Sequence, residues 1–513
     1  MNSWQRRSRV VVVGGGIAGL AAAFFLRDQA AEVTVLEGAP RLGGKLAVSD
    51  VAGIAVDSGA EALLARRPEG LEVIRAIGLA DQLVYPGTTT ASIWSRGVFH
   101  ALPRRQFMGV PADFGELERV GILSARGLDR ARQDATLPAT RRDGDVSVAA
   151  LVGARFGAEL VDRLVEPLLG GVYAGRPDQL SFEATLPGLA PVSRKHASLA
   201  EAVAVVLGPA PGTSPATGAG NGASTGTTAA QPPVFTTLAG GLGTLPQALA
   251  DASGALVRTG ATVRELARTA RGWRLTVGPA IAPEPIEADA VIFALPARPA
   301  SRLLGAVADA GGAAAALAEI EYASMAIVTL AYPVAAFPEP VRGSGYLVPA
   351  VDGRVVKAAT FSTAKWPHLA GGSGASGAAD ARTGPAAAGD LHLVRCSVGR
   401  IGEEAVLQRE DAELAALAAA DLAAATGVTG GPVDSRVTRW GGGLPQYSVG
   451  HLDRVARIRA GVAALPGVAV CGAAYDGVGI PACIASARLA AGQVAAYLES
   501  RAPVPREERL DQA

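Results

Sequence analysis

The chain has 513 residues, which is enough for two or three packed domains. Its 47 Lys and Arg residues balance its 47 Asp and Glu residues, so the net charge is zero and gives no electrostatic reason to expect a nucleic-acid partner. The three cysteines, Cys396, Cys471 and Cys483, are too few and too scattered for a disulfide framework or a zinc cluster, and they fit a reducing cytosol.

The first predicted elements are a strand, a glycine turn and a helix. Four consecutive valines, residues 10–13, are typical of a buried parallel strand. The pattern Gly14-x-Gly16-x-x-Gly19 then opens an apolar helix that ends near Arg27. Residues 6–26 also imitate a signal peptide or membrane anchor, but a spanning helix needs about 20 apolar residues, and consecutive glycines would weaken it. We therefore favour a nucleotide-binding strand–helix unit.

Each glycine of this turn has a physical reason. Gly14 permits the tight turn, Gly16 lets the backbone approach a pyrophosphate, and Gly19 allows close packing of helix on strand. The helix N-terminus offers N–H groups and a positive dipole end to phosphate. A second strand, residues 32–37, ends in Glu37, whose carboxylate can accept hydrogen bonds from ribose hydroxyls. Together these features predict a dinucleotide site.

The segment after Glu37 favours one kind of dinucleotide. In "GAPRLGGKL", Arg41 and Lys45 flank Gly43-Gly44, so the chain can run close to a cofactor while the two cations face phosphate. This extension resembles the flavoprotein pattern of the amine-oxidase and phytoene-desaturase superfamily, with Lys45 where Arg is commoner. The alternative interpretation is a glycine-rich surface turn.

The remaining elements predict an α/β plus α+β fold. A Rossmann-like FAD-binding domain is built from both chain ends, with an inserted mixed-sheet substrate domain and a helical domain. The predicted segments are FAD-binding parts at 1–90, 234–297 and 431–500, a helical substrate-access domain at 91–207, a flexible loop at 208–233, a substrate-binding domain at 298–430 with a flexible insert at 370–390, and a disordered tail at 501–513.

Several longer motifs resemble one family. "EPLLGGVYAG", "TLAGGLGTLPQAL", "KWPH", "RCSVGRIGEEA", "RWGGGLPQYSVGH" and "GAAYDGVGIPACIASARLAA" are similar to segments of the FAD-dependent porphyrinogen oxidases. This family contains the protoporphyrinogen oxidases and the Gram-positive coproporphyrinogen III oxidases. The resemblance runs from about Arg9 to Leu498, apart from the two low-complexity loops.

The resemblance implies which residues hold FAD. The glycine turn would hold the pyrophosphate, Glu37 the ribose and Val263 the adenine, while the "GAEA" segment and Trp440 would lie near the flavin. For Trp440 the alternative is plain core packing. The full set of implied FAD-binding residues is Gly14, Gly15, Gly16, Ile17, Ala18, Gly19, Glu37, Gly38, Arg41, Gly43, Gly44, Lys45, Gly59, Ala60, Glu61, Ala62, Val263, Trp440, Gly472, Val478, Gly479 and Ile480.

The resemblance also implies substrate contacts. A porphyrinogen carries propionates, so its pocket needs a cation, and Arg67 in "RRPEG" is at the position where Gram-positive relatives carry a substrate-facing basic residue. Gly171, Val172 and Tyr173 in "GGVYAG" would line the opposite wall. The alternatives are a solvated Arg67 and a Tyr173 that only packs in the core. The sequence shows neither metal-ligand spacing nor an obligatory base, so we expect no metal and assign no catalytic residue.

The implied reaction is the six-electron oxidation of a porphyrinogen by FAD, with molecular oxygen as acceptor and hydrogen peroxide as product. The implied pathway is heme biosynthesis. Coproporphyrinogen III is the favoured substrate, because "KWPH", "RCSVGR" and "RRPEG" look more like the Gram-positive group. Protoporphyrinogen IX oxidation, another amine-oxidase or desaturase activity, and a flavin-holding interaction protein remain alternatives. We expect a cytoplasmic protein with at most peripheral membrane contact, and a ferrochelatase is a conceivable recipient of the product.

Overall fold

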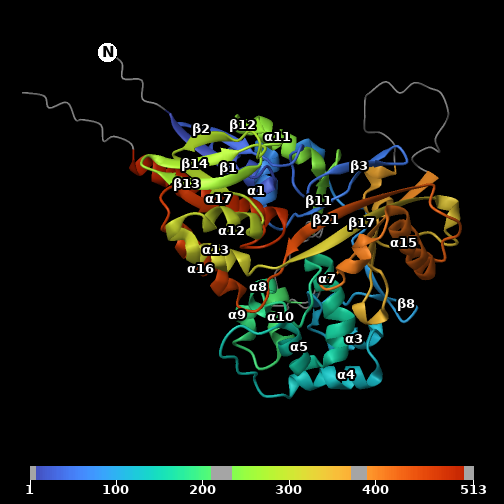
Figure 1. The fold of residues 1–513 in the computed structure, drawn as a ribbon. Coiled ribbons are helices and arrows are strands. Elements are labelled where there is room, and N and C mark those ends of the chain that lie inside the picture. Colours follow the sequence, from blue (N-terminus) through green and yellow to red (C-terminus); the bar gives the residue numbers. More distant parts are fainter. Residues whose placement is uncertain (1–6, 210–233, 371–389, 502–513) are drawn as a thin grey trace, which may run out of the picture. The chain divides into compact units, whose positions relative to one another are not determined.

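The computed structural model describes residues 7–209, 234–370 and 390–501 (Figure 1). The predicted flexible segments and tail lie almost entirely outside these residues. The chain divides into two compact units: unit 1 comprises Met1–Gly44, Leu245–Glu319 and Val455–Ala513, and unit 2 comprises Lys45–Thr244 and Ile320–Arg454. Unit 1 thus contains both chain ends. The unit boundaries differ from the predicted segment boundaries, and the functional labels of those segments stay predictions.

A five-stranded parallel sheet forms the centre of unit 1. The four valines of its middle strand β1 are at most 3% exposed, which explains why this strand has a continuous apolar sequence and not an alternating one. In spatial order the strands are β12 (Leu256–Arg258), β2 (Ala31–Leu36), β1 (Ser8–Val13), β16 (Ala290–Phe293) and β22 (Val468–Val470).

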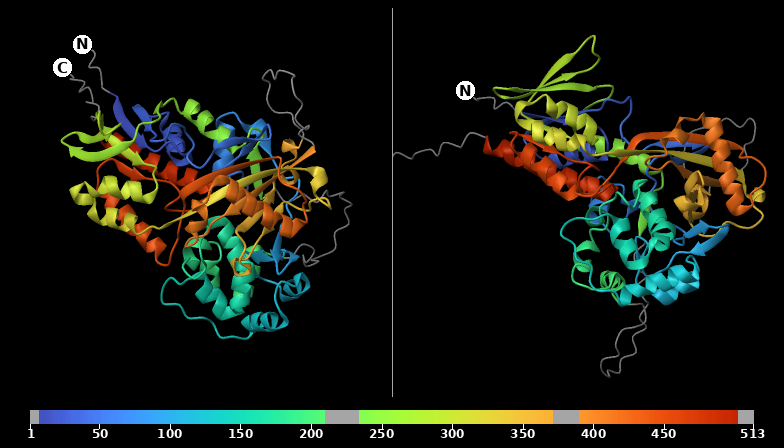
Figure 2. Two further views of the ribbon diagram at one scale, coloured as in Figure 1. Left: turned by 45° about the vertical axis from the view of Figure 1, so that its right-hand side comes forward. Right: turned by 60° about the horizontal axis from the view of Figure 1, so that its bottom comes forward.

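Helices from both chain ends pack together on this sheet. Helix α1 (Ile17–Leu26) contacts α17 (Ile480–Ser500) and α11 (Leu245–Ser253), and Figure 2 shows the blue and red segments side by side. The unit also contains α12 (Ala297–Gly305), α13 (Gly311–Ala318), the part of α16 (His451–Ala463) from Val455 onward, and an antiparallel sheet of β13 (Val263–Thr269), β14 (Gly272–Val277) and β15 (Glu284–Ala288).

A seven-stranded sheet organises unit 2. All neighbouring strands are antiparallel except β18 and β7, and helix α15 (Asp411–Thr426) packs against the long strands β17 and β21. In spatial order the strands are β21 (Asp434–Pro445), β17 (Tyr322–Pro333), β20 (Leu391–Val398), β19 (Val356–Phe361), β18 (Gly345–Leu347), β7 (Ser92–Ser95) and β8 (Val98–Ala101).

Smaller elements complete unit 2. The short sheets are β5 (Leu63–Leu64), β11 (Phe235–Leu238) and β6 (Leu83–Val84); β3 (Val48–Val51) and β4 (Ile54–Asp57); and β9 (Gln106–Phe107) and β10 (Val110–Pro111). The helices are α2 (Pro68–Ala76), α3 (Phe114–Val120), α4 (Ala125–Arg132), α5 (Val148–Phe156), α6 (Ala158–Leu160), α7 (Glu166–Tyr173), α8 (Phe182–Thr185), α9 (Ala190–Ser193), α10 (Leu199–Leu207) and α14 (Ser362–Lys365), with a π-helical turn at Val161–Val165.

Two local predictions differ from the structure. The sequence "FTTLAGGLGTLPQALADAS" predicts a loop followed by a helix, but Phe235–Leu238 is a strand, because it pairs with β5 and β6 from a distant part of the chain. The predicted helical segment begins with Ser92–Ser95 and Val98–Ala101, which extend the seven-stranded sheet, and its first α-helix starts at Phe114. Within the described ranges, no helix combines the length and the apolar character that crossing a membrane requires.

Candidate functional site

The glycine turn of unit 1 has the geometry that the sequence predicts. The Gly14 N–H donates to the Leu36 carbonyl at 2.8 Å, which fixes the turn to the neighbouring strand, and Gly14 has a φ of +110° that L-residues rarely adopt. A Cβ on Gly19 would overlap the Gly14 carbonyl oxygen. Helix α1 therefore reaches its position over β1 only because Gly19 has no side chain.

Gly16 is different, because the space beside it is open. It is the N-cap residue of α1, it makes no side-chain cap, and a Cβ placed there meets nothing within 4 Å. Ile17 and Ala18 follow in the first turn, whose N–H groups point out of the helix end. An uncapped helix N-terminus facing open space fits a pyrophosphate.

Glu37 lies at the end of β2 and holds the same turn. Its two carboxylate oxygens accept the N–H of Gly15 and the N–H of Ala39, each at 2.7 Å. Each oxygen keeps a further lone pair for a ribose hydroxyl. A Cβ on Gly38 would lie 3.2 Å from the Thr262 hydroxyl, next to Val263, so the structure brings Glu37, Gly38 and the start of β13 together.

The second glycine pair closes against the first turn. The Gly43 N–H donates to the Gly15 carbonyl at 2.8 Å, and Gly43 forms an isolated parallel bridge with Gly16. The Arg41 guanidinium donates to the carbonyl of Leu42 at 3.0 Å and to that of Gly44 at 2.7 Å. Arg41 thus stabilises its own turn, and its role toward phosphate stays a prediction.

A second uncapped helix start lies in unit 1. Gly479 is the N-cap of α17 without a side-chain cap, and Ile480 is the first helical residue after Val478. Gly472 has a φ of +122° and donates its N–H to the Ser486 hydroxyl at 2.9 Å. A Cβ on Gly472 would lie 3.9 Å from Ala18. The predicted residues at the two chain ends therefore meet.

The remaining predicted FAD residues belong to unit 2. A Cβ on Gly59 would overlap the Lys45 carbonyl oxygen and lie 3.1 Å from the Trp440 ring. The Trp440 indole N–H donates to the Ser58 carbonyl at 3.0 Å, and the Ala60 N–H donates to Lys45 at 3.1 Å. Lys45, Gly59, Ala60 and Trp440 are thus neighbours, although nearly 400 positions separate the ends of this group.

Glu61, which the resemblance places near the flavin, is the centre of an ionic group with two residues that had no predicted role, Lys365 and Arg395. Its carboxylate accepts from Lys365 at 2.7 Å and pairs with Arg395, and Arg395 also donates to the Gly59 carbonyl at 2.6 Å. We call Glu61, Lys365 and Arg395 the Glu61 cluster. The two cations outweigh the cost of burial and lower the pKa of Glu61 to about 2. Lys365 belongs to the motif "KWPH" and Arg395 to the motif "RCSVGR", and these motifs were the sequence signal that could have pointed to this cluster. Ala62 follows directly and is partly buried.

Asp57 lies two residues before Gly59 and is 8% exposed. Its carboxylate accepts the N–H groups of Leu242 and Gly243, both at 2.9 Å. Burial nevertheless raises the pKa of Asp57 to about 6, against the effect of these two bonds and of Arg395. This carboxyl group can therefore change its charge near neutral pH.

The predicted substrate residues are in different surroundings. Arg67 is the N-cap of α2, its side chain is 43% exposed, and its guanidinium pairs with Glu69. On α7, Gly171 and Val172 are exposed, whereas Tyr173 is 7% exposed and packs on Tyr447 at 5.5 Å between ring centres. Burial raises the pKa of Tyr173 to about 12, so the phenol stays neutral. Whether these residues contact substrate stays a prediction.

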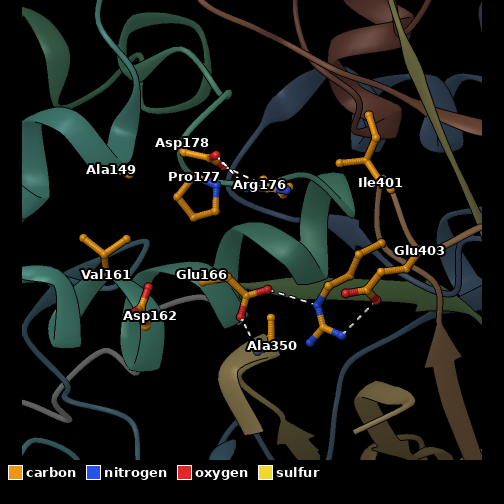
Figure 3. A pocket seen from close by; sticks show the side chains of 12 residues that line it. Ala149, Val161, Asp162, Glu166, Arg176, Pro177, Asp178, Ala350, Ile401 and Glu403 are labelled. Carbon is orange, nitrogen blue, oxygen red and sulfur yellow. Dashed lines mark hydrogen bonds and ion pairs between the residues drawn. The ribbon is translucent and has the colours of Figure 1, made fainter. Parts of the chain in front are cut away.

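A pocket of about 360 Å³ opens at the other end of α7 (Figure 3). Glu166 accepts the Arg400 guanidinium at 3.1 Å and the Ala350 N–H at 2.8 Å on its floor, and Glu403 lies 3.8 Å from Arg400. Burial outweighs Arg400 and raises the pKa of Glu166. None of the predicted substrate residues lines this pocket. Within the described ranges, no His, Cys, Asp and Glu side chains gather in a group that could hold a metal ion.

Several proteins are similar to this chain over nearly its whole length. Coproporphyrinogen III oxidase of Mycobacterium tuberculosis strain H37Rv is 36% identical over 499 residues, covering 96% of this chain and 98% of the relative. The Bacillus subtilis protein of the same name is 30% identical, covering 96% and 99%. A crystal structure described as a protoporphyrinogen oxidase from Exiguobacterium sp. 255-15 is 30% identical, with a TM-score of 0.79, and covers 96% of this chain and 99% of that one.

The family comparison covers nearly the whole chain. The profile described as "Flavin containing amine oxidoreductase" matches residues 17–495. The open, uncapped start of α1, the glycines that a Cβ would obstruct and the carboxylate of Glu37 fit the FAD that this family uses. The chain therefore belongs to the flavin-containing amine oxidoreductase family and is an FAD-dependent oxidoreductase.

Proposed function

We propose that this enzyme oxidises a porphyrinogen to the porphyrin, with coproporphyrinogen III as its substrate, molecular oxygen as the electron acceptor and hydrogen peroxide as the second product. The observation that carries the proposal is the full-length similarity, at 30–36% identity, to proteins named coproporphyrinogen III oxidase. When bound, FAD supplies the two-electron redox chemistry that a porphyrinogen requires.

The chain's own residues bind the cofactor and orient its flavin end. The start of α1 and Glu37 bind the dinucleotide, and the closely packed segment of Lys45, Gly59 and Trp440 orients the flavin end. The Glu61 cluster holds that segment through the bond from Arg395 to the Gly59 carbonyl.

Arg67 is the residue that we propose for recognition of a propionate. Its side chain is 43% exposed, and its pairing with Glu69 is of a kind that contributes little in water, roughly 0–1 kcal/mol. A substrate carboxylate can therefore replace Glu69 at small cost. We further propose that the product leaves to a metal-inserting enzyme such as a ferrochelatase, and that the enzyme works in the cytoplasm, where its three buried thiols stay reduced.

The test is fluorescence turnover of the purified, FAD-loaded protein with coproporphyrinogen III and protoporphyrinogen IX at matched concentrations, corrected for autoxidation. A kcat/KM at least tenfold larger for the substrate with four propionates supports the proposal. A larger value for protoporphyrinogen IX would assign the enzyme to the second candidate, which the name of the Exiguobacterium relative favours. Bound FAD without turnover of either compound would refute porphyrinogen oxidation.

A further inference from the structure

Five buried polar atoms without a hydrogen-bond partner belong to side chains that line one small pocket in unit 2. Among the described residues, none offers a hydrogen bond to any of them, and all five side chains line the same space. The atoms are Thr237 Oγ1, Ser362 Oγ, Trp366 Nε1, His368 Nδ1 and Arg395 Nε. We call this space, which Asp57 and Glu61 also line, the Asp57 pocket. Such atoms are nearly always satisfied in folded proteins, so five of them around one pocket indicate a missing hydrogen-bonding partner.

The five side chains come from three segments of the chain, because Ser362, Trp366 and His368 lie within one stretch of seven residues. Thr237 is on β11, Ser362 begins α14, Trp366 follows α14, and Arg395 is on β20. The side chains of these four residues are at most 8% exposed. Strands β11 and β20 and the stretch from Ser362 to His368 are far apart in the sequence, and the fold brings them to one pocket. The pocket is therefore built by the fold.

The size of the pocket limits what it can hold. About 20 Å³ is accessible to the centre of a water-sized sphere, and one water needs roughly 10–15 Å³ on this measure. One or two waters fit. A buried water makes about three hydrogen bonds, so one water satisfies about half of the five orphaned atoms and the Asp57 carboxylate, and two waters can satisfy all six.

The chemistry of the wall excludes a simple ion. Arg395 Nε and Trp366 Nε1 can only donate, the two hydroxyls donate or accept, and Asp57 accepts when it is ionised. A bare anion would face the carboxylates of Asp57 and Glu61, and a bare cation would face Arg395. A molecule that accepts on one side and donates on the other, as water does, satisfies both sides.

We propose that the Asp57 pocket is a site for one or two ordered waters, which connect Asp57 to Arg395 and His368 and carry a proton between Asp57 and solvent. The charged groups that face Asp57 are Arg395 on β20 and Glu61, which forms an ion pair with Lys365. The titratable His368, on the turn after Trp366, lines the same pocket. Burial raises the pKa of Asp57 to about 6, which suits a group that gains and loses a proton near neutrality.

The proton role rests on the proposed function. Each two-electron oxidation of a porphyrinogen gives a hydride to the flavin and must release one proton. In the relay, a meso C–H bond of the porphyrinogen breaks to give the hydride and a pyrrole N–H bond breaks to give the proton. That proton binds the Asp57 carboxylate, which then passes a proton to a pocket water as the water loses another toward His368 and solvent. Through the pocket, one proton moves and no electron does. Asp57 is a suitable start because it is two residues from Gly59, which is predicted to pass near the flavin.

The occupancy test is a pair of high-resolution crystal structures of the FAD-loaded enzyme, wild type and the Thr237→Val/Ser362→Ala double variant. The expected result is ordered water within hydrogen-bond distance of Thr237 and at least two other orphaned atoms in the wild type, with at least one water lost in the variant. An empty wild-type pocket, or density that only an ion explains, overturns the proposal. Thr236→Val is the control, because the Thr236 hydroxyl donates to the Val84 carbonyl at 2.8 Å and Thr236 does not line the pocket.

The change in Tm of one variant tests independently whether the pocket holds water. If waters fill the pocket, Thr237→Val removes one of their ligands and lowers Tm. If the pocket is dry, the same change removes an orphaned hydroxyl and raises Tm, which contradicts the proposal.

The proton role has its own measurement. In the double variant, kcat is expected to fall at least threefold with KM unchanged, and the inflection of kcat near pH 6 is expected to move or disappear. An unchanged kcat and pH profile in a variant whose waters are lost overturns the relay. If the wild type does not oxidise porphyrinogens at all, the proposed function fails, and the crystal structures still decide whether the water site exists.

Discussion

The glycine turn before α1 and the Glu61 cluster differ in what holds them in place. The turn depends on the absence of side chains: Gly19 lets a helix lie against the Gly14 carbonyl, and Gly16 leaves space in front of the helix. The Glu61 cluster depends on charge, because a buried carboxylate is held by two cations. Steric arrangements are insensitive to pH, whereas a charged group loses its effect when the carboxylate is protonated. Mutations in the two regions should therefore fail in different ways.

Gly19→Ala should have the largest effect. The new Cβ would overlap a backbone oxygen, which cannot rotate away, so helix α1 must shift, at a cost of about 3 kcal/mol or more in the free energy of unfolding. FAD binding should be lost with it. The checks are urea unfolding of the FAD-free protein and flavin content after purification.

Gly16→Ala is the matched control, because its Cβ meets nothing within 4 Å. The FAD-free protein should unfold within about 1 kcal/mol of the wild type, since only the N-cap changes. FAD affinity should still fall at least tenfold, because the methyl group occupies the space predicted for the pyrophosphate. Equal FAD affinity in the variant and the wild type would show that the pyrophosphate lies elsewhere.

Glu61→Gln should destabilise the protein by about 3 kcal/mol at neutral pH, which corresponds to the lowering of the pKa of Glu61 from 4.5 to about 2. The sign follows from linkage: the folded state binds this proton less tightly than the unfolded state. The stabilisation is therefore complete above pH 4.5 and is lost as the pH falls toward 2. Unfolding curves across this pH range should show a smaller acid loss in the variant.

Glu166→Gln sharpens the comparison, because Glu166 is also buried against an arginine but its pKa is raised. The folded state already favours the neutral form, so replacing the carboxylate with an amide should cost clearly less than Glu61→Gln at pH 7. Equal losses of unfolding free energy would mean that the second cation at Glu61 adds nothing.

Trp440→Phe should cost about 1 kcal/mol, because the Ser58 carbonyl loses the indole N–H. This variant also separates the two interpretations of Trp440. A change in the absorbance spectrum of bound FAD places the ring near the flavin, whereas an unchanged spectrum supports core packing alone.

Arg67→Gln should have the smallest effect on stability, well under 1 kcal/mol, because its ion pair with Glu69 is exposed. If Arg67 binds a propionate, KM for coproporphyrinogen III should rise roughly tenfold, as the loss of about 1.4 kcal/mol of a charge-assisted hydrogen bond would produce. The exposed neighbour Arg66 provides the control Arg66→Gln. Equal KM values for both variants would remove Arg67 from the substrate site.

The parts of the fold that the sequence predicts are those with local signals. The valines of β1, the glycine turn, α1 and Glu37 lie within thirty residues, and each has a steric or hydrogen-bonding reason that can be seen in the sequence. The Glu61 cluster joins residues 61, 365 and 395, and strand β11 pairs with β5 and β6. Such pairings depend on the three-dimensional course of the chain, which no local pattern encodes. The motifs "KWPH" and "RCSVGR" marked the right segments without identifying their partner.

The most direct test of the proposed function is anaerobic mixing of the FAD-loaded enzyme with coproporphyrinogen III, followed by flavin absorbance. Our account predicts that the flavin is bleached as porphyrin fluorescence appears, and that admitting oxygen restores the absorbance and yields hydrogen peroxide. Porphyrin formation without bleaching, or a flavin that the substrate leaves oxidised, would contradict it.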